Sequence, residues 1–441
     1  MNILLLGSGG REHAIACKLA ESSRCTQLYV APGNAGTASM DKCQNVKLSP
    51  TDFDAIRDFV FANNIEMVVV GPEAPLVEGI ADYFASVPLL RKVALIGPSK
   101  QGAMLEGSKD YAKQFMLRYG IPTAAHRTFT YDTLEEGISY LHKQKGPYVL
   151  KADGLAAGKG VLILDKYTDA KRELTHMLRD HKFGEASSSV VVEQFLSGVE
   201  LSVFVLTDGK HYVILPTAKD YKRIGEGDTG LNTGGMGSIS PVPFADKAFM
   251  SKVEERIVVP TVRGLHQENI SYKGFIFIGL MAVPDAQTGE LEPYVIEYNV
   301  RMGDPETESV FPRIKSDIVE LFEQTWRGTL RHADLAVDPR TAACVMMVAG
   351  GYPESYRKGD VITGVEKVEE SMVFHAGTAR NESGELVTAG GRVLCVTSLA
   401  NTMPEAILKS YQELGKIQWN DAYHRQDIGQ DLMKMILEKT L

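Results

Sequence analysis

The first hundred residues repeat a short apolar run followed by a turn that contains glycine. The four runs are residues 3–6, 28–31, 67–70 and 93–96, and the turns begin at Gly7, Gly33, Gly71 and Gly97. Amphipathic helices are expected between the runs, at about residues 12–20 and 53–62. Strands and helices that alternate at this spacing are typical of a parallel, doubly wound sheet, in which ligands bind at the carboxyl ends of the strands.

The rest of the chain divides where this pattern changes. We expect an N-terminal α/β domain at residues 1–107, a central region at 108–335 and a small α+β domain at 336–441. The central region is expected to contain a mobile glycine-rich subdomain at about 124–193, followed by antiparallel strands. The glycine-rich segment 220–240 is expected to be a long functional loop.

Composition limits the possible partners. The net charge of −9 argues against a nucleic-acid surface and against binding to an acidic membrane. No apolar run approaches the roughly 20 residues that a membrane span needs. Met1 leads directly into a strand without a basic leader, and the five scattered cysteines fit reduced thiols, so we expect a cytoplasmic protein.

Residues 293–307 begin as an apolar strand and end as a polar turn. Glu297 and Asn299 lie two apart, so on a strand both side chains leave the same face. Hard oxygen ligands on one face suit a magnesium ion that bridges ATP phosphates. Arg301 and Asp304 follow on the turn. The alternative is a solvated turn after an edge strand, which the apolar residues of the strand make less favourable.

Residues 7–13 follow a strand and open a helix, which makes them a candidate anion site. They resemble the start of a dinucleotide-binding motif, but Glu12 stands where that motif has its third glycine or alanine. The segment therefore favours a phosphorylated substrate. Dinucleotide binding and a purely structural turn remain as alternatives.

Residues 151–161 place Lys151 at the end of a strand, then a flexible loop of small residues that includes Gly158. A hairpin of this kind can close over phosphates and offer backbone N–H groups, with Lys151 as a point charge. It is not a P-loop, because a strand and not a helix follows. The alternative is a mobile hairpin tip with a solvated lysine.

Two further segments fit a nucleotide site. Residues 193–200 form a strand that breaks at Ser197-Gly198 and resumes, and they could offer an adenine edge, an apolar floor and a carboxylate for ribose. Residues 219–223 carry three cations beside the glycines of 232–237, which suits a phosphate clamp. A plain interdomain turn and a solvated basic run are the respective alternatives.

These sites, in this order, resemble those of the ATP-grasp ligases and, within them, the family of phosphoribosylamine–glycine ligases. The segments that carry the resemblance are residues 7–13, 151–161, 232–237 and, most specifically, 301–307, and the match covers essentially the whole length. The family usually has Phe where this chain has Met302, an apolar replacement. The resemblance implies a doubly wound N-terminal domain, central ATP-grasp domains and a small α+β C-terminal domain.

The resemblance also implies a reaction. ATP, glycine and 5-phosphoribosylamine would give glycinamide ribonucleotide, ADP and phosphate through glycyl phosphate, in de novo purine biosynthesis. The cofactor would be Mg²⁺ or Mn²⁺. The partners would be these small molecules, with no nucleic acid and no membrane, and the protein would be a monomer or a weak homodimer.

Residue roles follow from the same resemblance. Glu297 and Asn299 would hold the metal, and Arg301, Asp304 and Lys219 would act at the reacting groups. The residues expected to bind ATP are Lys109, Lys151, Gly158, Glu193, Phe195, Leu196 and Glu200. Those expected to bind phosphoribosylamine are Gly9, Gly10, Asp220 and Asp304.

Three other functions remain open from the sequence. A different ATP-grasp enzyme, such as a carboxylase that activates bicarbonate, would share the ATP site. An NAD-dependent dehydrogenase could be built on the first domain, although Glu12 argues against it. A non-catalytic nucleotide sensor would be expected to lack Glu297, Asn299 or Lys151, and none of the three is missing.

Overall fold

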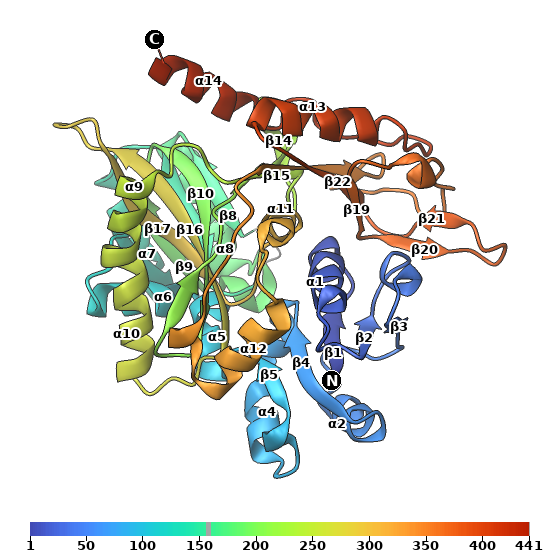
Figure 1. The fold of residues 1–441 in the computed structure, drawn as a ribbon. Coiled ribbons are helices and arrows are strands. Elements are labelled where there is room, and N and C mark those ends of the chain that lie inside the picture. Colours follow the sequence, from blue (N-terminus) through green and yellow to red (C-terminus); the bar gives the residue numbers. More distant parts are fainter. Residues whose placement is uncertain (156–159, 441) are drawn as a thin grey trace.

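The computed structural model describes residues 1–155 and 160–440 (Figure 1). Its N-terminal sheet is parallel throughout, with strand order β3-β2-β1-β4-β5. The strands are β1 (Asn2–Gly7), β2 (Gln27–Pro32), β3 (Cys43–Asn45), β4 (Ile65–Val70) and β5 (Ala94–Ile96). The helices are α1 (Gly10–Glu21), α2 (Phe53–Ala62), α3 (Glu73–Glu78), α4 (Ile80–Ser86) and α5 (Lys100–Gly107). The predicted doubly wound sheet is confirmed, whereas β3, α3, α4 and α5 were not predicted.

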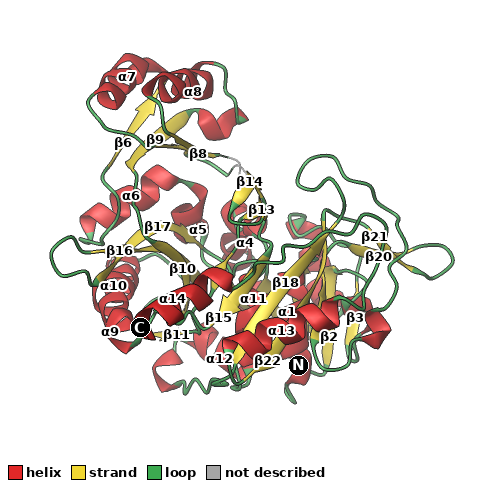
Figure 2. Ribbon diagram, turned by 90° about the horizontal axis from the view of Figure 1, so that it is seen from above, coloured by secondary structure: helices red, strands yellow, loops and turns green. Residues whose placement is uncertain are grey.

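A small lobe, residues 126–155 and 160–194, follows helix α6 (Lys109–Arg118). Its antiparallel sheet has the order β6-β9-β7-β8. The strands are β6 (His126–Thr130), β7 (Tyr148–Ala152), β8 (Val161–Leu164) and β9 (Ser189–Gln194), and the helices are α7 (Leu134–His142) and α8 (Tyr167–Arg179). Figure 2 shows the lobe standing apart from the rest of the molecule. It has a hydrophobic core of its own, so it can pack as a unit.

The central sheet is antiparallel, in the order β11-β10-β16-β17. Its strands are β10 (Val199–Thr207), β11 (Tyr212–Ile214), β16 (Gly274–Pro284) and β17 (Leu291–Asn299), and helices α9 (Lys247–Val253) and α10 (Val259–Gln267) accompany it. Glu297 pairs with Gly279, but Val295 pairs with Leu280. Ile296 is therefore the extra residue of a β-bulge, where the ladder is locally interrupted.

A third sheet joins the central and C-terminal parts of the chain, in the order β12-β15-β18-β22-β19. Its strands are β12 (Lys219–Asp220), β15 (Gly237–Ser240), β18 (Thr341–Val348), β19 (Met372–His375) and β22 (Arg392–Ala400). Two hairpins stand beside it: β13 (Arg223–Gly225) with β14 (Thr229–Asn232), and β20 (Thr378–Arg380) with β21 (Leu386–Thr388). The remaining helices are α11 (Glu306–Val310), α12 (Ile318–Arg327), α13 (Met403–Leu414) and α14 (Gln430–Thr440).

The prediction that residues 220–240 form a loop was wrong in part. The segment contains β13, β14 and β15, and β15 pairs with β18, about a hundred residues further along the chain. A glycine-rich strand whose partner is so distant has no local signature, because its hydrogen bonds depend on another part of the sequence.

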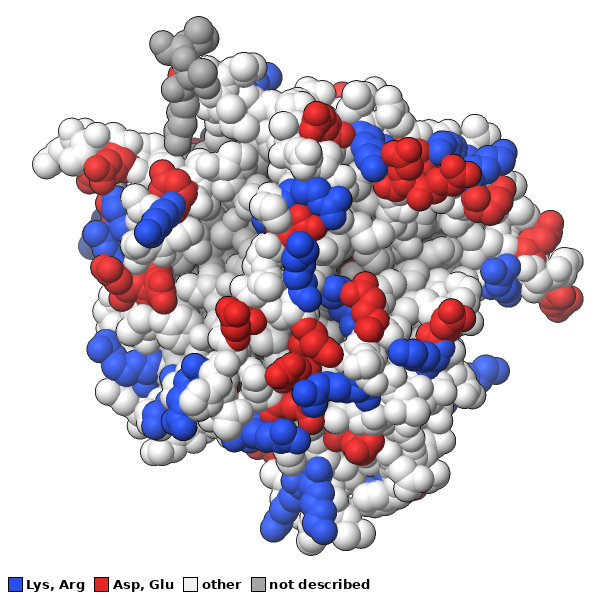
Figure 3. All heavy atoms as spheres, in the orientation of Figure 1, with Lys and Arg blue, Asp and Glu red and all other residues white. Residues whose placement is uncertain are grey.

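The surface carries charges of both signs. On the face shown in Figure 3, Lys and Arg alternate with Asp and Glu, without a broad field of either sign. Among the helices described, none is both long and apolar enough to cross a membrane.

Candidate active site

Lys151 and Glu193 form a buried ion pair in the small lobe. They lie on the neighbouring strands β7 and β9, with Lys151 Nζ 3.1 Å from Glu193 Oε2. Lys151 also donates a hydrogen bond of 3.3 Å to the carbonyl of Ile296, the bulge residue of β17. The bulge therefore provides the acceptor that links the small lobe to the central sheet beside Glu297.

Lys113 is a second lysine that contacts Glu193, and no sequence pattern indicates this contact. Its Nζ lies 3.2 Å from the same Oε2 and donates to Thr123 at 2.7 Å. Burial lowers the pKa of Lys113 to about 8, against the opposing attraction of Glu193. Glu193 Oε1 has no hydrogen-bond partner among the described residues. One carboxylate thus balances two lysines and keeps one oxygen available to a ligand.

Glu297 and Asn299 lie on β17, as predicted, two strand positions apart. Burial opposes ionisation of Glu297, but Lys222, Lys151 and Lys109 together hold its pKa below the usual value. A groove passes this carboxylate, and its polar lining includes Glu200, Ser202, Asp220, Lys222 and Glu297. Three lysines around an ionised carboxylate form an environment that suits both phosphates and a divalent cation.

Glu200 of β10 and Asp220 of β12 both line this groove. Lys222 Nζ lies 2.8 Å from Glu200 and is the main cause of the lowered pKa of that carboxyl. Burial raises the pKa of Asp220, and Glu200 adds to the effect. The segment predicted to be a phosphate clamp therefore does reach the groove, through Lys222.

Lys109 begins α6 beside the hairpin between β7 and β8. Its Nζ donates to the carbonyl of Gly154 at 3.2 Å, and burial lowers its pKa. Gly158, also predicted to bind ATP, lies outside the described residues. Phe195 and Leu196 lie where β9 of the small lobe leads into β10 of the central sheet, and Phe195 is exposed.

The amino-terminal end of α1 is surrounded by carboxylates. The N–H of Gly9 donates to Glu12 Oε2 at 2.7 Å, and the N–H of Arg11 donates to Asp304 Oδ2 at 3.3 Å. A Cβ atom at Gly7 would lie 2.4 Å from the Glu12 side chain, and one at Gly71 only 2.1 Å from it. Glu12, which breaks the dinucleotide motif in the sequence, thus occupies the space that two glycines leave open.

Arg301 joins the polar turn to the N-terminal domain. Its Nη2 lies 2.8 Å from Glu106 Oε1, and its Nε lies 3.4 Å from Glu73 Oε2. Burial raises the pKa of Glu106, although Arg301 counteracts it, and the N–H of Val300 donates to the other oxygen of Glu106. Arg301 is therefore held between two carboxylates near the strand end that bears Asn299.

Arg392 brings the C-terminal domain into the site and was missed by the sequence analysis. Its Nη2 lies 3.0 Å from Asp304 Oδ1, and its Nη1 donates to the carbonyls of Asp304 and Gly234 at 2.8 and 2.9 Å. One guanidinium thus fixes the polar turn and the glycine segment 232–237 relative to each other.

Lys219 is engaged with the C-terminal helix. Its Nζ lies 3.0 Å from Asp431 and 3.9 Å from the centre of the Tyr221 ring, and Tyr221 donates to the same carboxylate. Lys219 also lowers the pKa of Glu200, so it contributes positive charge to the groove.

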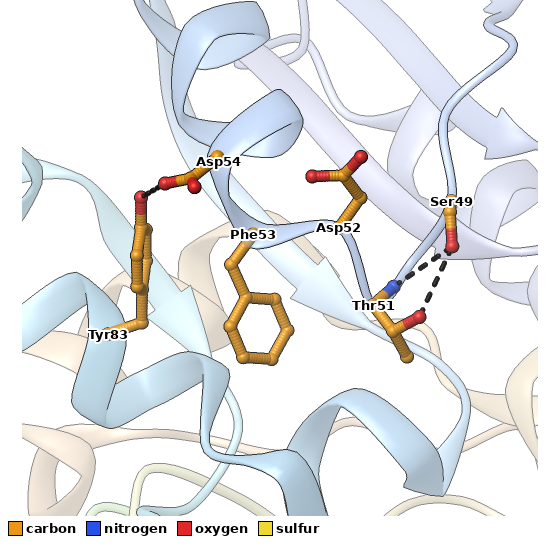
Figure 4. A pocket seen from close by; sticks show the side chains of 6 residues that line it. All are labelled: Ser49, Thr51, Asp52, Phe53, Asp54 and Tyr83. Carbon is orange, nitrogen blue, oxygen red and sulfur yellow. Dashed lines mark hydrogen bonds between the residues drawn. The ribbon is translucent and has the colours of Figure 1, made fainter.

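A separate surface depression lies at the start of α2 (Figure 4). It is lined by Ser49, Thr51, Asp52, Phe53, Asp54 and Tyr83. Asp52 caps α2 by accepting from the N–H of Ala55, and Tyr83 donates to Asp54. Its polar groups are engaged with one another, and it contains none of the predicted site residues.

Two lobes meet at Lys151, beside Glu297 and Asn299 of β17 and a glycine-rich segment, and this arrangement is that of the ATP-grasp proteins. The model of the phosphoribosylglycinamide synthetase ATP-grasp (A) domain matches residues 107–307, and those of its N and C domains match 1–106 and 342–431. The chain belongs to the phosphoribosylglycinamide synthetase family.

Relatives of known sequence and solved structures support the same family. Phosphoribosylamine–glycine ligase of Haemophilus influenzae is 45% identical over the full length of both chains, and that of Pseudomonas aeruginosa is 44% identical over 97% of each. The crystal structure of the Thermotoga maritima ligase has a TM-score of 0.83 and 36% identity, over 97% of this chain and 100% of that one. The biotin carboxylase domain of Hydrogenobacter thermophilus 2-oxoglutarate carboxylase, solved with MgADP, shares the fold at 17% identity and a TM-score of 0.67, over 96% and 91%.

Proposed function

We infer that the protein ligates glycine to 5-phosphoribosylamine at the expense of ATP, giving glycinamide ribonucleotide, ADP and phosphate in purine biosynthesis. The observation that carries this conclusion is the identity of 44–45% to phosphoribosylamine–glycine ligases over nearly the whole chain. The site agrees with it, because phosphoryl transfer needs positioning and charge neutralisation more than a protein nucleophile.

The donor set fits a divalent metal bound together with ATP. Glu297 is kept ionised, and Asn299 offers an amide oxygen from the same strand. Among the described residues, no cluster of three or more His, Cys, Asp or Glu side chains could hold a metal alone, so the nucleotide would supply the other oxygens. When bound, Mg²⁺ or Mn²⁺ would neutralise charge on the transferred phosphoryl group.

We propose that the buried lysines bind the phosphates of ATP. Lys151 and Lys109 flank Glu297, and Lys113 supports Lys151 through their shared partner Glu193. The glycine carboxylate would attack the γ-phosphorus and release ADP. The amine of phosphoribosylamine would then attack the acyl carbon, forming the C–N bond as the C–O bond to phosphate breaks.

We place phosphoribosylamine at the acceptor cluster, which we define as Gly9, Gly10, Arg11, Glu12 and Asp304. The N–H groups of Gly9 and Arg11 already donate to carboxylates. The cluster therefore offers acceptors, which suit the amine and the sugar hydroxyls of this substrate better than its phosphate. Arg301 would meet the acyl phosphate, and Asp220 would contact the substrate from the groove.

The remaining expectations are part of the same proposal. The enzyme would act in the cytoplasm on small molecules alone, with no nucleic-acid or membrane partner, as a monomer or a weak homodimer. The net charge of −9 and the interspersed surface charges support the absence of a polyanionic partner.

The first test is ADP formation from Mg-ATP and freshly generated phosphoribosylamine, with and without glycine. We expect ADP that depends strictly on glycine, with glycinamide ribonucleotide as the product. If ADP formation did not depend on glycine but did depend on bicarbonate or another carboxylate, the ATP-grasp assignment would stand and the proposed substrate would be wrong. Folded protein that forms no ADP with any acceptor would leave a binding function.

A second prediction concerns the hairpin β13–β14, which the C-terminal segment holds in place. Arg425 is almost fully buried and pairs with Asp228 of the hairpin and with Asp427, both at 2.7 Å. Arg425→Ala would free the hairpin that follows Lys222 and leave two carboxylates without their cation. We expect kcat/KM for ATP to fall about tenfold, as for the loss of a hydrogen-bonded charged partner.

The matched control is Arg327→Ala, which removes an exposed arginine from its pair with Glu323, a carboxylate that keeps Arg24 as a partner. It is expected to change kcat/KM for ATP less than twofold. An Arg425→Ala variant with normal ATP kinetics and a lower melting temperature would show that the ion pairs of Arg425 contribute to stability alone.

A further inference from the structure

Glu308 carries a buried carboxyl group that lies next to the acceptor cluster. The proposed mechanism does not use this group. It lies on α11, directly after the polar turn, and is fully buried. Among the described residues, no N–H or O–H group donates a hydrogen bond to either of its oxygens. A Cβ atom at Gly10 would lie 2.3 Å from its Oε1, so Glu308 touches the first turn of α1.

Every neighbouring element contributes charged or titratable groups. On its own segment these are Asp304 and Glu306; those on the elements packed against it are Arg11, Glu12 and His13 of α1, Cys344 of β18, and Arg392 and Cys395 of β22. Arg392 pairs with Asp304, and Arg11 pairs with Glu12. No described cation forms an ion pair with Glu308, so an ionised Glu308 would be a buried charge without compensation.

The two neighbouring carboxyls have opposite tendencies. Burial raises the pKa of Glu308 well above its usual value, and Asp304 adds to the effect. Burial acts the same way on Asp304, but Arg392 and Arg11 outweigh it and lower that pKa, with a hydrogen bond from Glu308 contributing. Two ionised carboxylates would be acceptors only, so their contact becomes a hydrogen bond once Glu308 carries a proton.

We propose that Glu308 is a positioning residue for the amine substrate: a neutral carboxylic acid that donates a hydrogen bond to Asp304 and holds it, ionised, beside Gly9. The geometry agrees, because a Cβ atom at Gly9 would lie 2.9 Å from Asp304 Oδ2, on the side where Arg11 N–H also meets this oxygen. The assignment of the amine to this place rests on the proposed function.

The kinetic test compares Glu308→Gln with Glu308→Leu. Glutamine keeps a neutral donor of the same shape, so kcat/KM for phosphoribosylamine should stay within about threefold of the wild type. Leucine removes the donor, so KM for phosphoribosylamine should rise about tenfold or more while KM for ATP stays within twofold. The acid limb of the pH profile should move to higher pH in the leucine variant alone, because Asp304 loses a donor to its ionised form.

A second measurement reads the charge state without any turnover. A carboxyl whose pKa is raised by folding favours the folded state at low pH, and this contribution is lost as the pH rises above its ordinary value of about 4.5. Glu308→Gln cannot lose it. The glutamine variant should therefore gain in melting temperature over the wild type as the pH rises from 5 to 8.5.

The outcomes separate the two proposals. A melting difference that is independent of pH would show that Glu308 is not neutral, and an unchanged KM in Glu308→Leu would show that it positions nothing; either overturns the inference. If the wild type had no ligase activity, the proposed function would fail, and the melting curves would still decide the charge of Glu308.

Discussion

Replacing Glu297 by glutamine is expected to reduce kcat about 1000-fold, with a small change in the melting temperature. In the proposed site its carboxylate would be the ionised oxygen ligand of the metal, and Lys222, Lys151 and Lys109 hold its pKa below the usual value. Removing one preorganised electrostatic partner of a transition state costs about 100- to 1000-fold in other enzymes, and loss of the proposed metal contact would add to that. The side chain is partly exposed and keeps its shape as glutamine, so the core is unaffected.

The measurement is glycine-dependent ADP formation over a range of magnesium concentrations. Glu290→Gln is the matched control, since Glu290 precedes β17 in the same hairpin and is exposed beside Lys252. It should behave like the wild type. A Glu297→Gln variant with a normal rate at limiting magnesium would refute the metal assignment.

Gly10→Ala is expected to lower kcat/KM for phosphoribosylamine about 100-fold. The added Cβ atom would lie 2.3 Å from Oε1 of Glu308 and 3.2 Å from its Cδ, so either Glu308 or the start of α1 must move. Overpacking of this kind costs about 1–3 kcal/mol, and here it displaces Asp304 and Gly9 as well. ATP binding, measured by calorimetry without phosphoribosylamine, should change less than twofold because Lys151 and Glu297 lie elsewhere.

Gly107→Ala is the control for Gly10→Ala. A Cβ atom at Gly107 would meet its nearest neighbour, Val77, at 3.5 Å, which is ordinary contact. Its kinetics should match those of the wild type. Normal phosphoribosylamine kinetics in Gly10→Ala would place that substrate away from α1.

The strand pattern was sufficient to predict that Glu297 and Asn299 share one strand, but not what surrounds them. The spacing of Glu297 and Asn299 needs only the two-residue repeat of a strand. The bulge at Ile296 depends on its pairing with β16, and no single-strand pattern encodes it. Lys113 lies in a helix with charged neighbours and resembles a surface lysine until Glu193 is brought against it.

The residues of the acceptor cluster were even harder to predict from the sequence than the surroundings of Glu297. Gly9 and Gly10 stand out in the sequence, because glycine directly after a strand indicates a tight turn or a close approach of the backbone to another group. In the sequence, Glu12 was notable only as an exception to a motif. The structure shows that its side chain fills the space that the neighbouring glycines leave open. Arg392 and Glu308 reach the cluster from β22 and α11, so their roles depend on how the chain folds over long distances.

The sheet that contains β15 has a consequence for the order in which the enzyme is made. Domains generally fold from the N-terminus as the chain is synthesised, so the parallel sheet and the small lobe can form early. Strand β15 gains its second neighbour only when residues 341–348 have been made, and Arg425, which clamps the adjoining hairpin, follows later still. We therefore expect the segment that carries Lys219, Asp220 and Lys222 to be fixed last, so that an unfinished chain would lack an assembled site and would not consume ATP without making product.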